Sequence, residues 1–277
     1  MILITGAKGQ LGSDIVLEMN QRGIDCTGID VTELDITDKQ AVHSYLHILK
    51  PNCVIHCAAY TAVDAAEDNE ELCMRVNKSG TENIAIACCE TNAEMLYIST
   101  DYVFNGEGIT PYETDTPTEP LQVYGKSKLA GEEAIQRNMD KFCIIRTSWV
   151  FGTNGNNFVK TMLQLAKIRD EINVVNDQIG SPTYTPDLAV LLCDMALSQK
   201  YGIYHATNEG YCSWAEFAQE IMLISGNSCR IKPIPTEQYV TLAVRPKNSR
   251  MSKASLDKAG FSRLPGWKDA LERFMKQ

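Results

Sequence analysis

The sequence predicts an α/β protein with a doubly wound parallel sheet and a smaller C-terminal lobe. Short apolar runs alternate with amphipathic stretches from the N-terminus to about residue 152. Buried strands that alternate with helices in this way form a parallel sheet that is covered on both faces. In addition, the first apolar run leads through three closely spaced glycines straight into a helix pattern, as is typical of the first unit of such a sheet.

Each expected element has its own pattern. The strands are short, nearly continuous apolar runs, as expected when both faces are buried, and they occupy residues 1–5, 26–30, 53–59, 95–100 and 142–152. The helices repeat apolar residues every three or four positions, and they occupy residues 12–23, 38–50, 71–92 and 126–138. The sheet domain is therefore expected to span residues 1–152.

After residue 152 the alternation becomes less regular. Ser213 and Glu216 have the spacing of a capping box, which marks a helix start. We expect helices at 158–170, 186–199 and 213–226, and strands at 172–177 and 202–208. We assign residues 174–207 to the sheet domain, and residues 153–173 and 208–277 to the smaller lobe.

The composition excludes several classes of protein. The chain has 277 residues and a net charge of −9, which argues against a nucleic-acid surface because phosphate binding needs clustered Lys and Arg. No apolar run is long enough to span a bilayer, and the N-terminus lacks the pattern of a signal peptide. We therefore expect a cytoplasmic protein that has reduced cysteines and no membrane partner.

Gly6, Gly9 and Gly12 follow the first strand in the pattern G-x-x-G-x-x-G. A strand, a glycine turn and a helix N-terminus bring backbone N–H groups and the positive end of the helix dipole against a pyrophosphate. The alternative is a purely structural turn between strand and helix. The position of the pattern at the start of the first helix favours a Rossmann-type dinucleotide site.

Asp30 ends the second strand, at the distance from the glycines that is typical of a ribose-binding acid. Such a carboxylate accepts a hydrogen bond from the ribose 2′-hydroxyl of an adenosine, whereas its charge would repel a 2′-phosphate. The sequence therefore favours NADH over NADPH, and Lys8 within the glycine loop is expected to offset part of that charge. The alternative for Asp30 is an ordinary turn residue.

Tyr124 and Lys128 are four residues apart at the start of a predicted helix, so their side chains share one face. A carbonyl that accepts a hydride also needs a proton, which a phenol can donate, and a neighbouring ammonium would lower the pKa of that phenol. Thr100 offers a hydroxyl at a strand end, whereas Ser99 should point to the opposite side of the strand. The alternatives are a packing tyrosine and a solvated lysine.

These motifs resemble those of the extended short-chain dehydrogenases/reductases, and within that family those of the dTDP-4-dehydrorhamnose reductases. The general resemblance rests on the glycine pattern, the Ser/Thr at a strand end and Y-x-x-x-K. The closer one rests on the blocks GAKGQLG, AAYTAVDAAE, STDYVFNG, VYGKSKLAGE, RTSWVFG, NNFVKTML, VVNDQIGSPT and RPKNSRMS. The blocks extend from residue 6 to about residue 252, nearly the whole chain.

The resemblance implies roles for individual residues. The cofactor would be held by Gly6, Gly9, Gln10, Leu11, Gly12, Asp30, Asp35, Ile36, Ala59, Tyr60, Thr61, Tyr124 and Lys128. The substrate would contact Thr100, Asp101, Trp149, Arg245, Asn248 and Ser249. Within the catalytic set of Tyr124, Lys128 and Thr100, Tyr124 would donate the proton and Lys128 would hold the nicotinamide ribose. The sheet domain would bind the dinucleotide and the smaller lobe the substrate.

The implied reaction is the NAD(P)H-dependent reduction of the 4-keto group of the nucleotide sugar dTDP-4-dehydro-L-rhamnose to dTDP-L-rhamnose. Two other functions stay open: an epimerase of nucleotide sugars that retains NAD, and a non-catalytic regulatory subunit of methionine adenosyltransferase. Some family members are described as dimers linked by Mg²⁺ through interface carboxylates. No acids of this sequence map onto those carboxylates, so no metal ligand is assigned, and a monomer and a homodimer both stay open.

Two polar groups of residues receive no role. His43 and His47 have an i, i+4 spacing that could bind zinc, but no third ligand stands near them in the sequence. We expect them to lie on a partly exposed helix face. Asp64, Glu67 and Asp68 are expected to form the solvated, acidic start of a helix.

Overall fold

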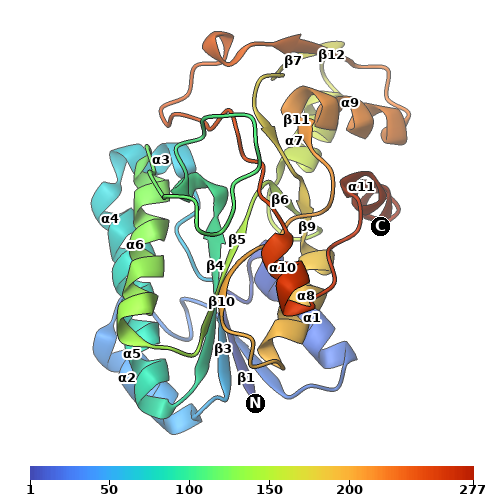
Figure 1. Ribbon diagram of the computed structural model, residues 1–277. Coiled ribbons are helices and arrows are strands. Elements are labelled where there is room, and N and C mark those ends of the chain that lie inside the picture. Colours follow the sequence, from blue (N-terminus) through green and yellow to red (C-terminus); the bar gives the residue numbers. More distant parts are fainter.

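The computed structural model describes residues 1–277. Its main body is a six-stranded sheet in which all neighbouring strands are parallel. In spatial order the strands are β10 (Gly202–His205), β5 (Phe142–Thr147), β4 (Glu94–Thr100), β3 (Cys53–His56), β1 (Ile2–Thr5) and β2 (Cys26–Ile29). Helices cover both faces of this sheet, which confirms the predicted fold class (Figure 1).

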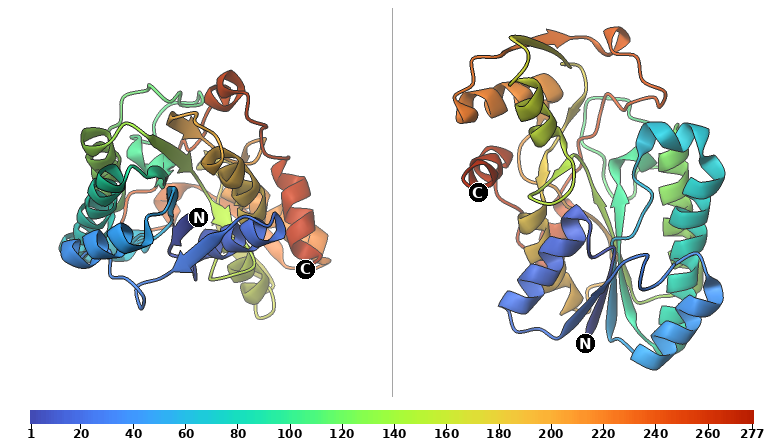
Figure 2. Two further views of the ribbon diagram at one scale, coloured as in Figure 1. Left: turned by 90° about the horizontal axis from the view of Figure 1, so that it is seen from below. Right: turned by 180° about the vertical axis from the view of Figure 1, so that it is seen from behind.

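Successive side chains of each strand point to opposite faces, and two separate cores result. Leu3 and Val54 pack in the first core, which is covered by α2 (Lys39–Leu49), α5 (Thr81–Thr91) and α6 (Val123–Asn138). Ile4 and Ile55 pack in the second core, which is covered by α1 (Gln10–Gln21), α8 (Thr185–Ala196) and α10 (Ala254–Ala259). Figure 2 shows the two layers of helices on either side of the sheet. No helix combines the length and the apolar character that a membrane span requires.

The connection between β3 and α5 differs from the expected single helix over 71–92. It consists of α3 (Val63–Asp68), α4 (Glu70–Met74) and a π-helical turn, η1 (Arg75–Gly80), that continues directly into α5. π-helical turns are rare in proteins, but those that occur often lie at functional sites. Here the turn carries Asn77, whose side chain faces the loop after β3. A 3₁₀ turn, η2 (Asp101–Val103), follows β4.

The smaller lobe lies beyond the C-terminal ends of the sheet strands (Figure 1). Its core contains Phe151, Phe217 and Trp267. Its helices are α7 (Phe158–Leu165), α9 (Trp214–Ser225), α11 (Trp267–Met275) and the 3₁₀ turn η3 (Thr236–Gln238). Its strands are β6 (Val150–Phe151), β7 (Glu171–Val175), β8 (Ile179–Gly180), β9 (Thr183–Tyr184), β11 (Cys212–Ser213) and β12 (Arg230–Ile234). The capping box that was predicted for α9 is present, because Ser213 and Glu216 each accept a hydrogen bond from the backbone N–H of the other.

The chain passes between the two units more than once. β10 forms the edge of the main sheet next to β5, whereas β7 pairs with β12 in the lobe. Leu256 and Leu264 pack in the same core as α1 and α8. The segment around α10 therefore packs on the sheet domain, although the sequence pattern assigned it to the smaller lobe.

Candidate active site

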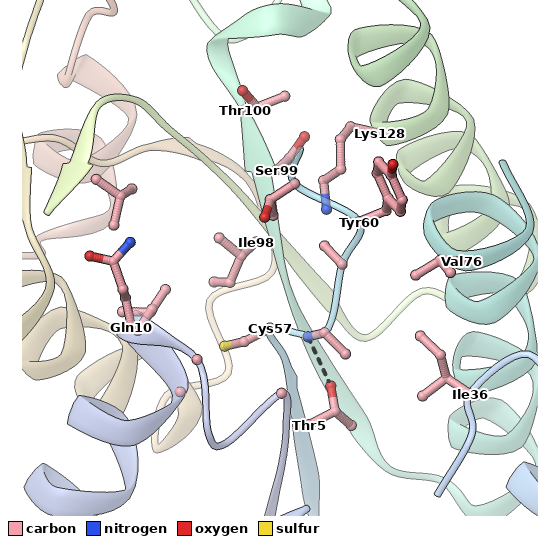
Figure 3. A pocket seen from close by; sticks show the side chains of 18 of the residues that line it. Thr5, Gln10, Ile36, Cys57, Tyr60, Val76, Ile98, Ser99, Thr100 and Lys128 are labelled. Carbon is pink, nitrogen blue, oxygen red and sulfur yellow. Dashed lines mark hydrogen bonds between the residues drawn. The ribbon is translucent and has the colours of Figure 1, made fainter. Parts of the chain in front are cut away.

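A cavity of about 840 Å³ lies at the C-terminal ends of β1, β3, β4 and β5 (Figure 3). β2 and β3 flank β1 on opposite sides, so the direction of winding reverses between β1 and β3. Doubly wound sheets bind their ligands at this kind of switch point. All the predicted cofactor residues line the cavity, together with Thr100, Asp101 and Trp149. Arg245, Asn248 and Ser249 are not part of its lining.

The glycine loop is packed so tightly that side chains are excluded from two of its positions. Gly6 has φ +67°, and a Cβ at that position would lie 2.7 Å from the backbone nitrogen of Ala58. A Cβ at Gly12 would lie 2.2 Å from the carbonyl oxygen of Gly6. The N-terminus of α1 therefore opens into the cavity with its free N–H groups, an arrangement that fits a pyrophosphate.

Asp30 is held at the edge of the cavity by backbone hydrogen bonds. Its carboxylate accepts hydrogen bonds from the N–H groups of Lys8 at 3.1 Å and Val31 at 2.8 Å. The Lys8 ammonium forms an ion pair with Glu33 at 3.2 Å and donates a hydrogen bond to the Thr32 hydroxyl. Lys8 is thus paired with Glu33 in solvent-exposed surroundings, and its expected partial offset of the Asp30 charge stays a prediction.

Asn77 positions the segment after β3, and sequence reasoning missed it. Its side chain accepts a hydrogen bond from the backbone N–H of Tyr60 at 2.7 Å and donates one to the Tyr60 carbonyl at 3.0 Å. It also donates to the hydroxyl of Ser127 on α6 at 2.9 Å. The amide therefore joins the loop that carries Ala59, Tyr60 and Thr61 to the helix that carries Tyr124 and Lys128. An asparagine inside an otherwise helical pattern was the only signal in the sequence.

Tyr124 and Lys128 both line the cavity from α6, and each has its own electrostatic surroundings. Burial and the nearby charge of Asp101 raise the pKa of the Tyr124 phenol, whereas a hydrogen bond with Thr100 lowers it. The Lys128 ammonium lies over the ring of Tyr97, 4.0 Å from its centroid. Burial lowers the pKa of Lys128 to about 7, and Glu132 opposes that change. Lys128 is not among the leading causes of the change in the pKa of Tyr124, so its effect on that phenol stays a prediction.

Thr100 and Asp101 form a polar group at the end of β4. The Thr100 hydroxyl donates a hydrogen bond to Asp101 at 2.9 Å and accepts one from the N–H of Tyr102. Burial raises the pKa of Asp101 to about 6, and the nearby hydroxyls of Ser249 and Thr100 oppose that rise. Ser249 lies near Asp101 although it does not line the cavity, and the buried Ser249 hydroxyl has no hydrogen-bond partner in the structure. Ser99 also lines the cavity (Figure 3), but its hydroxyl donates a hydrogen bond to the buried carboxylate of Glu132 at 2.5 Å.

Trp149 forms the wall of the cavity on the side of the smaller lobe. It has φ +50°, a left-handed backbone conformation that is uncommon for a bulky residue. Its ring stacks on Trp214 of α9, with centroids 3.7 Å apart and planes 14° apart. A Cβ at Gly180 would lie 2.7 Å from the Trp149 ring, so this glycine is required for the close approach. Sequence reasoning did not identify Trp214.

Arg245 is held near the cavity by two neighbours. Its guanidinium forms an ion pair with Asp64 of α3 and donates a hydrogen bond to the Tyr102 hydroxyl at 3.0 Å. Asp64 also accepts a hydrogen bond from the N–H of Ala243 at 3.1 Å. Asn248 is buried and donates to the carbonyl groups of two residues in the 105–111 loop, so its amide holds that loop.

The acidic group on α3 is therefore not merely solvated, as the sequence pattern indicated. Asp64 binds the segment that contains Arg245. Glu67 accepts a hydrogen bond from the N–H of Val123 at 3.0 Å and so caps the start of α6, which has no side-chain cap of its own. Asp68 alone is exposed, as predicted. Both contacts join residues far apart in the sequence, so local patterns carried no signal for them.

Known proteins share this fold and sequence along the whole chain. The family described as RmlD substrate binding domain matches residues 1–277. The spore coat polysaccharide biosynthesis protein SpsK of Bacillus subtilis is 42% identical over 100% of this chain and 97% of its own length. A dTDP-4-dehydrorhamnose reductase of Aggregatibacter actinomycetemcomitans is 42% identical over 98% of this chain and 97% of its own.

A crystal structure is equally similar. The dTDP-4-dehydrorhamnose reductase of Bacillus anthracis, in complex with NADP, is 42% identical to this chain. The match covers 99% of this chain and 98% of that protein's chain, and the two structures superimpose with a TM-score of 0.97. The family match and these relatives thus cover both the sheet domain and the lobe. The chain belongs to the RmlD substrate binding domain family, the family of the dTDP-4-dehydrorhamnose reductases.

Proposed function

We propose that the chain reduces the 4-keto group of dTDP-4-dehydro-L-rhamnose with NAD(P)H and so produces dTDP-L-rhamnose. The observation that carries this proposal is the geometry of one cavity. A glycine loop that fits a pyrophosphate lies at one part of its wall, and a phenol, a lysine and a threonine hydroxyl from α6 and β4 lie at another. The names of the relatives with 42% identity support the choice of substrate.

The residues of the cavity fit a nicotinamide dinucleotide. The glycine loop, whose glycines leave the backbone N–H groups open to the cavity, and the N-terminus of α1 would hold the pyrophosphate. Asp30 would bind the adenosine ribose. Lys128 would hold the nicotinamide ribose. A bound NAD(P)H would supply the hydride for the keto carbon of the substrate.

Tyr124 is the proton donor in this proposal. A buried phenol whose pKa is raised keeps its proton at neutral pH, so Tyr124 is in the acid form that a developing alkoxide needs. The hydroxyl of Thr100 lies beside the phenol and bonds to Asp101. It orients the phenol near the substrate oxygen.

The lobe would hold the sugar and the diphosphate. Trp149 presents a flat apolar face, and Trp214 on its other side keeps it in place. Arg245 is fixed by Asp64 and Tyr102 at the side of the cavity, and its guanidinium is suited to a diphosphate oxygen pair. Asp101, which lines the cavity, would accept hydrogen bonds from sugar hydroxyls.

We infer that NADH is preferred over NADPH. The Asp30 carboxylate is fixed at the cavity edge, and the nearby lysine is paired with Glu33. A ribose 2′-phosphate would therefore meet two carboxylates and only one cation. The relative from Bacillus anthracis was solved with NADP, so the preference is a question of degree that kinetics must measure.

The test is an assay of NADH oxidation with purified protein and dTDP-4-dehydro-L-rhamnose, repeated with NADPH. We expect one NADH to be consumed per sugar reduced, with a higher kcat/KM for NADH than for NADPH. Asp30→Asn should narrow that difference while Tyr124, Lys128 and Thr100 stay intact. A kcat/KM that favours NADPH in the wild-type protein would disprove the preference without affecting the proposed reaction.

The same assay separates the two alternative functions. An epimerase that retains NAD needs no net reductant, so the stoichiometric loss of NADH would exclude it. A non-catalytic regulatory subunit would show no turnover with the sugar and would capture a methionine adenosyltransferase. Absence of NADH oxidation with a correctly folded, NADH-binding protein would refute the proposed reductase reaction.

A further inference from the structure

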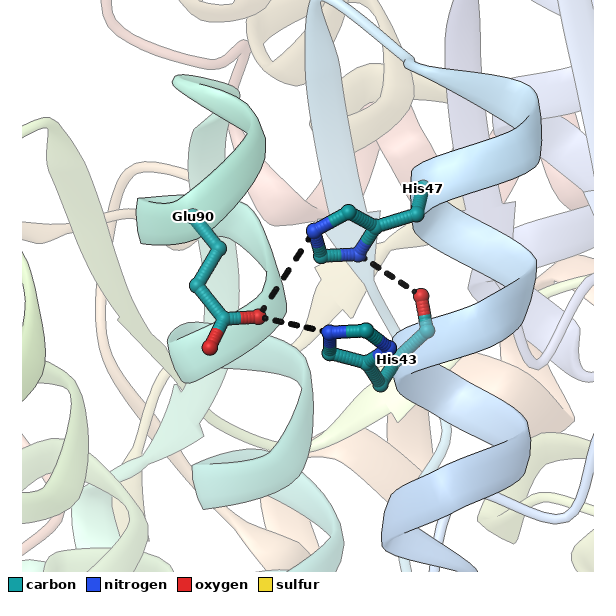
Figure 4. A group of neighbouring side chains, drawn as sticks. All are labelled: His43, His47 and Glu90. Atoms are coloured by element: carbon teal, nitrogen blue, oxygen red, sulfur yellow. Dashed lines mark hydrogen bonds and ion pairs between the residues drawn. The ribbon is translucent and has the colours of Figure 1, made fainter.

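Two imidazoles and a carboxylate lie together on the surface of the sheet domain. His43 and His47 are one helical turn apart on α2, and Glu90 is in the last turn of α5, which packs beside α2. Figure 4 shows both rings next to the Glu90 carboxylate. In the sequence no third ligand lies near the two histidines, and for that reason they receive no role from the sequence alone. The packing of α5 against α2 brings Glu90 beside them as a third ligand.

Both imidazoles approach the same carboxylate oxygen. The Nε2 atoms of His43 and His47 are 3.5 Å and 3.9 Å from Oε2 of Glu90. Potential donor atoms of the three residues all lie within 4.8 Å of one another. Around a tetrahedral Zn²⁺ with bonds of about 2.0–2.1 Å, neighbouring donor atoms are about 3.4 Å apart. Small rotations of these partly exposed side chains would therefore bring all three donors to bonding distance.

The orientation of His47 is fixed through its other nitrogen. Nδ1 of His47 lies 2.9 Å from the backbone carbonyl of His43. A carbonyl only accepts, so Nδ1 carries a proton, and Nε2 of the neutral ring presents a lone pair on the side of Glu90. Metal-binding histidines typically donate their second ring N–H to a backbone carbonyl or carboxylate in this way.

The lone pair on Nε2 of His47 and the Glu90 oxygen that it faces repel each other unless a cation lies between them. Protons could serve, but the rings of His43 and His47 are stacked with centroids 3.9 Å apart. A proton on each ring would place two positive charges in close contact. One divalent cation shared by both imidazoles and Glu90 satisfies all three groups at once.

We propose that His43, His47 and Glu90 bind a borderline divalent cation, Zn²⁺ in the first place, with solvent in the remaining position. Two imidazoles and one carboxylate suit Zn²⁺, whereas Mg²⁺ and Ca²⁺ take mainly oxygen ligands. The last turns of α2 and α5 lie at the start of β3 and β4, the edge of the sheet opposite the cavity. The ion joins α2 to α5 there and takes no part in the reaction.

The chain allows a selective test, because His43 and His47 are its only histidines that are not buried; His56 and His205 have no exposed surface. Full-length protein that has been treated with EDTA is titrated with ZnSO₄ by calorimetry, and its unfolding temperature is measured with and without the metal. We expect one Zn²⁺ per chain and a higher unfolding temperature. His43→Ala, His47→Ala and Glu90→Gln should each weaken binding by about tenfold or more.

Cys89 provides the matched control, because this exposed thiol adjoins Glu90 and is itself a zinc-binding group. Zn²⁺ binding should survive in Cys89→Ser. The proposal is overturned if the wild-type protein binds no Zn²⁺, if the His43→Ala/His47→Ala variant binds it unchanged, or if only Cys89→Ser abolishes binding. NADH turnover should be the same in all these variants, so the result is independent of the proposed reductase activity.

Discussion

The ammonium of Lys128 lies 4.0 Å from the centroid of the Tyr97 ring, on the strand next to its helix. Tyr97 is fully buried, and its hydroxyl donates a hydrogen bond to the Lys128 carbonyl at 3.3 Å. The ring thus stabilises a buried cation through its π face. This contact gives Lys128 a partner on the sheet that the Y-x-x-x-K spacing does not indicate.

Tyr124→Phe should keep NADH binding and lose turnover. Removal of the hydroxyl removes the proposed general acid, whose contribution is typically a factor of about 10²–10⁴ in rate. The ring that packs edge-to-face against Tyr102 is retained, so the site should keep its shape. NADH fluorescence titration and kcat with the 4-keto sugar measure the two effects. Near-normal turnover in this variant would rule out Tyr124 as the acid.

Asp101→Asn should make the stability of the protein less dependent on pH. Because burial raises the pKa of Asp101 from 3.8 to about 6, the folded state holds this proton more tightly than the unfolded state. Wild-type stability therefore falls as pH rises from about 4 to 6, by about 3 kcal/mol from this one group. The neutral amide of Asp101→Asn does not titrate, so the variant does not lose this stability as the pH rises.

Urea unfolding of wild type and Asp101→Asn at several values between pH 4 and pH 8 measures this difference. The variant should gain stability relative to wild type as the pH rises and should reach a plateau above pH 7. Asp115→Asn, in an exposed loop, controls for the loss of a carboxylate. A difference that is constant with pH, or that has the opposite slope, would contradict a raised pKa.

The sheet and its glycine loop could be predicted because they depend on local patterns. Apolar runs such as residues 53–56 must be buried on both faces of a sheet, and Gly12 is required by its contact with Gly6 in the same loop. The same argument explains why the capping box at Ser213 was correct. These features depend mainly on residues that are close in the sequence, and Gly6, which also approaches Ala58, shows where a distant segment adds its own requirement.

The supports of the site could not be predicted because they come from distant parts of the chain. Asn77 reaches Ser127 across 50 positions, and Asp64 reaches Arg245 across 181. Helical spacing placed Tyr124 and Lys128 on one face correctly, but the direction of the lysine depends on a strand residue, Tyr97, that no spacing rule names. Local patterns thus identify the residues that line the cavity more readily than the residues that hold them in place.

Asp64→Asn should weaken binding of the nucleotide sugar without affecting the chemical step. The carboxylate fixes Arg245 and the N–H of Ala243, and bonds to charged groups contribute about 1.5–3 kcal/mol. We therefore expect KM for the sugar to rise by about tenfold while kcat and KM for NADH stay close to wild type. Asp68→Asn, an exposed acid on the same helix, is the matched control and should leave all three constants unchanged. A fall in kcat alone would assign Asp64 to a different role.

Trp214→Ala should loosen the sugar side of the cavity through Trp149. The backbone of Trp149 has φ +50°, which costs energy for a bulky residue and persists only where packing holds it. The stack on Trp214, with centroids 3.7 Å apart, supplies that packing, so its removal should raise KM for the sugar and leave NADH affinity intact. Trp214→Phe keeps an aromatic face and should restore most of the affinity, because stacked aromatic pairs contribute about 0.5–1.5 kcal/mol beyond burial. Steady-state kinetics on both variants, with near-ultraviolet circular dichroism to follow the tryptophan pair, provide the measurement. If Trp214→Ala keeps the wild-type KM while the dichroism signal of the pair is lost, Trp149 holds its position without the stack.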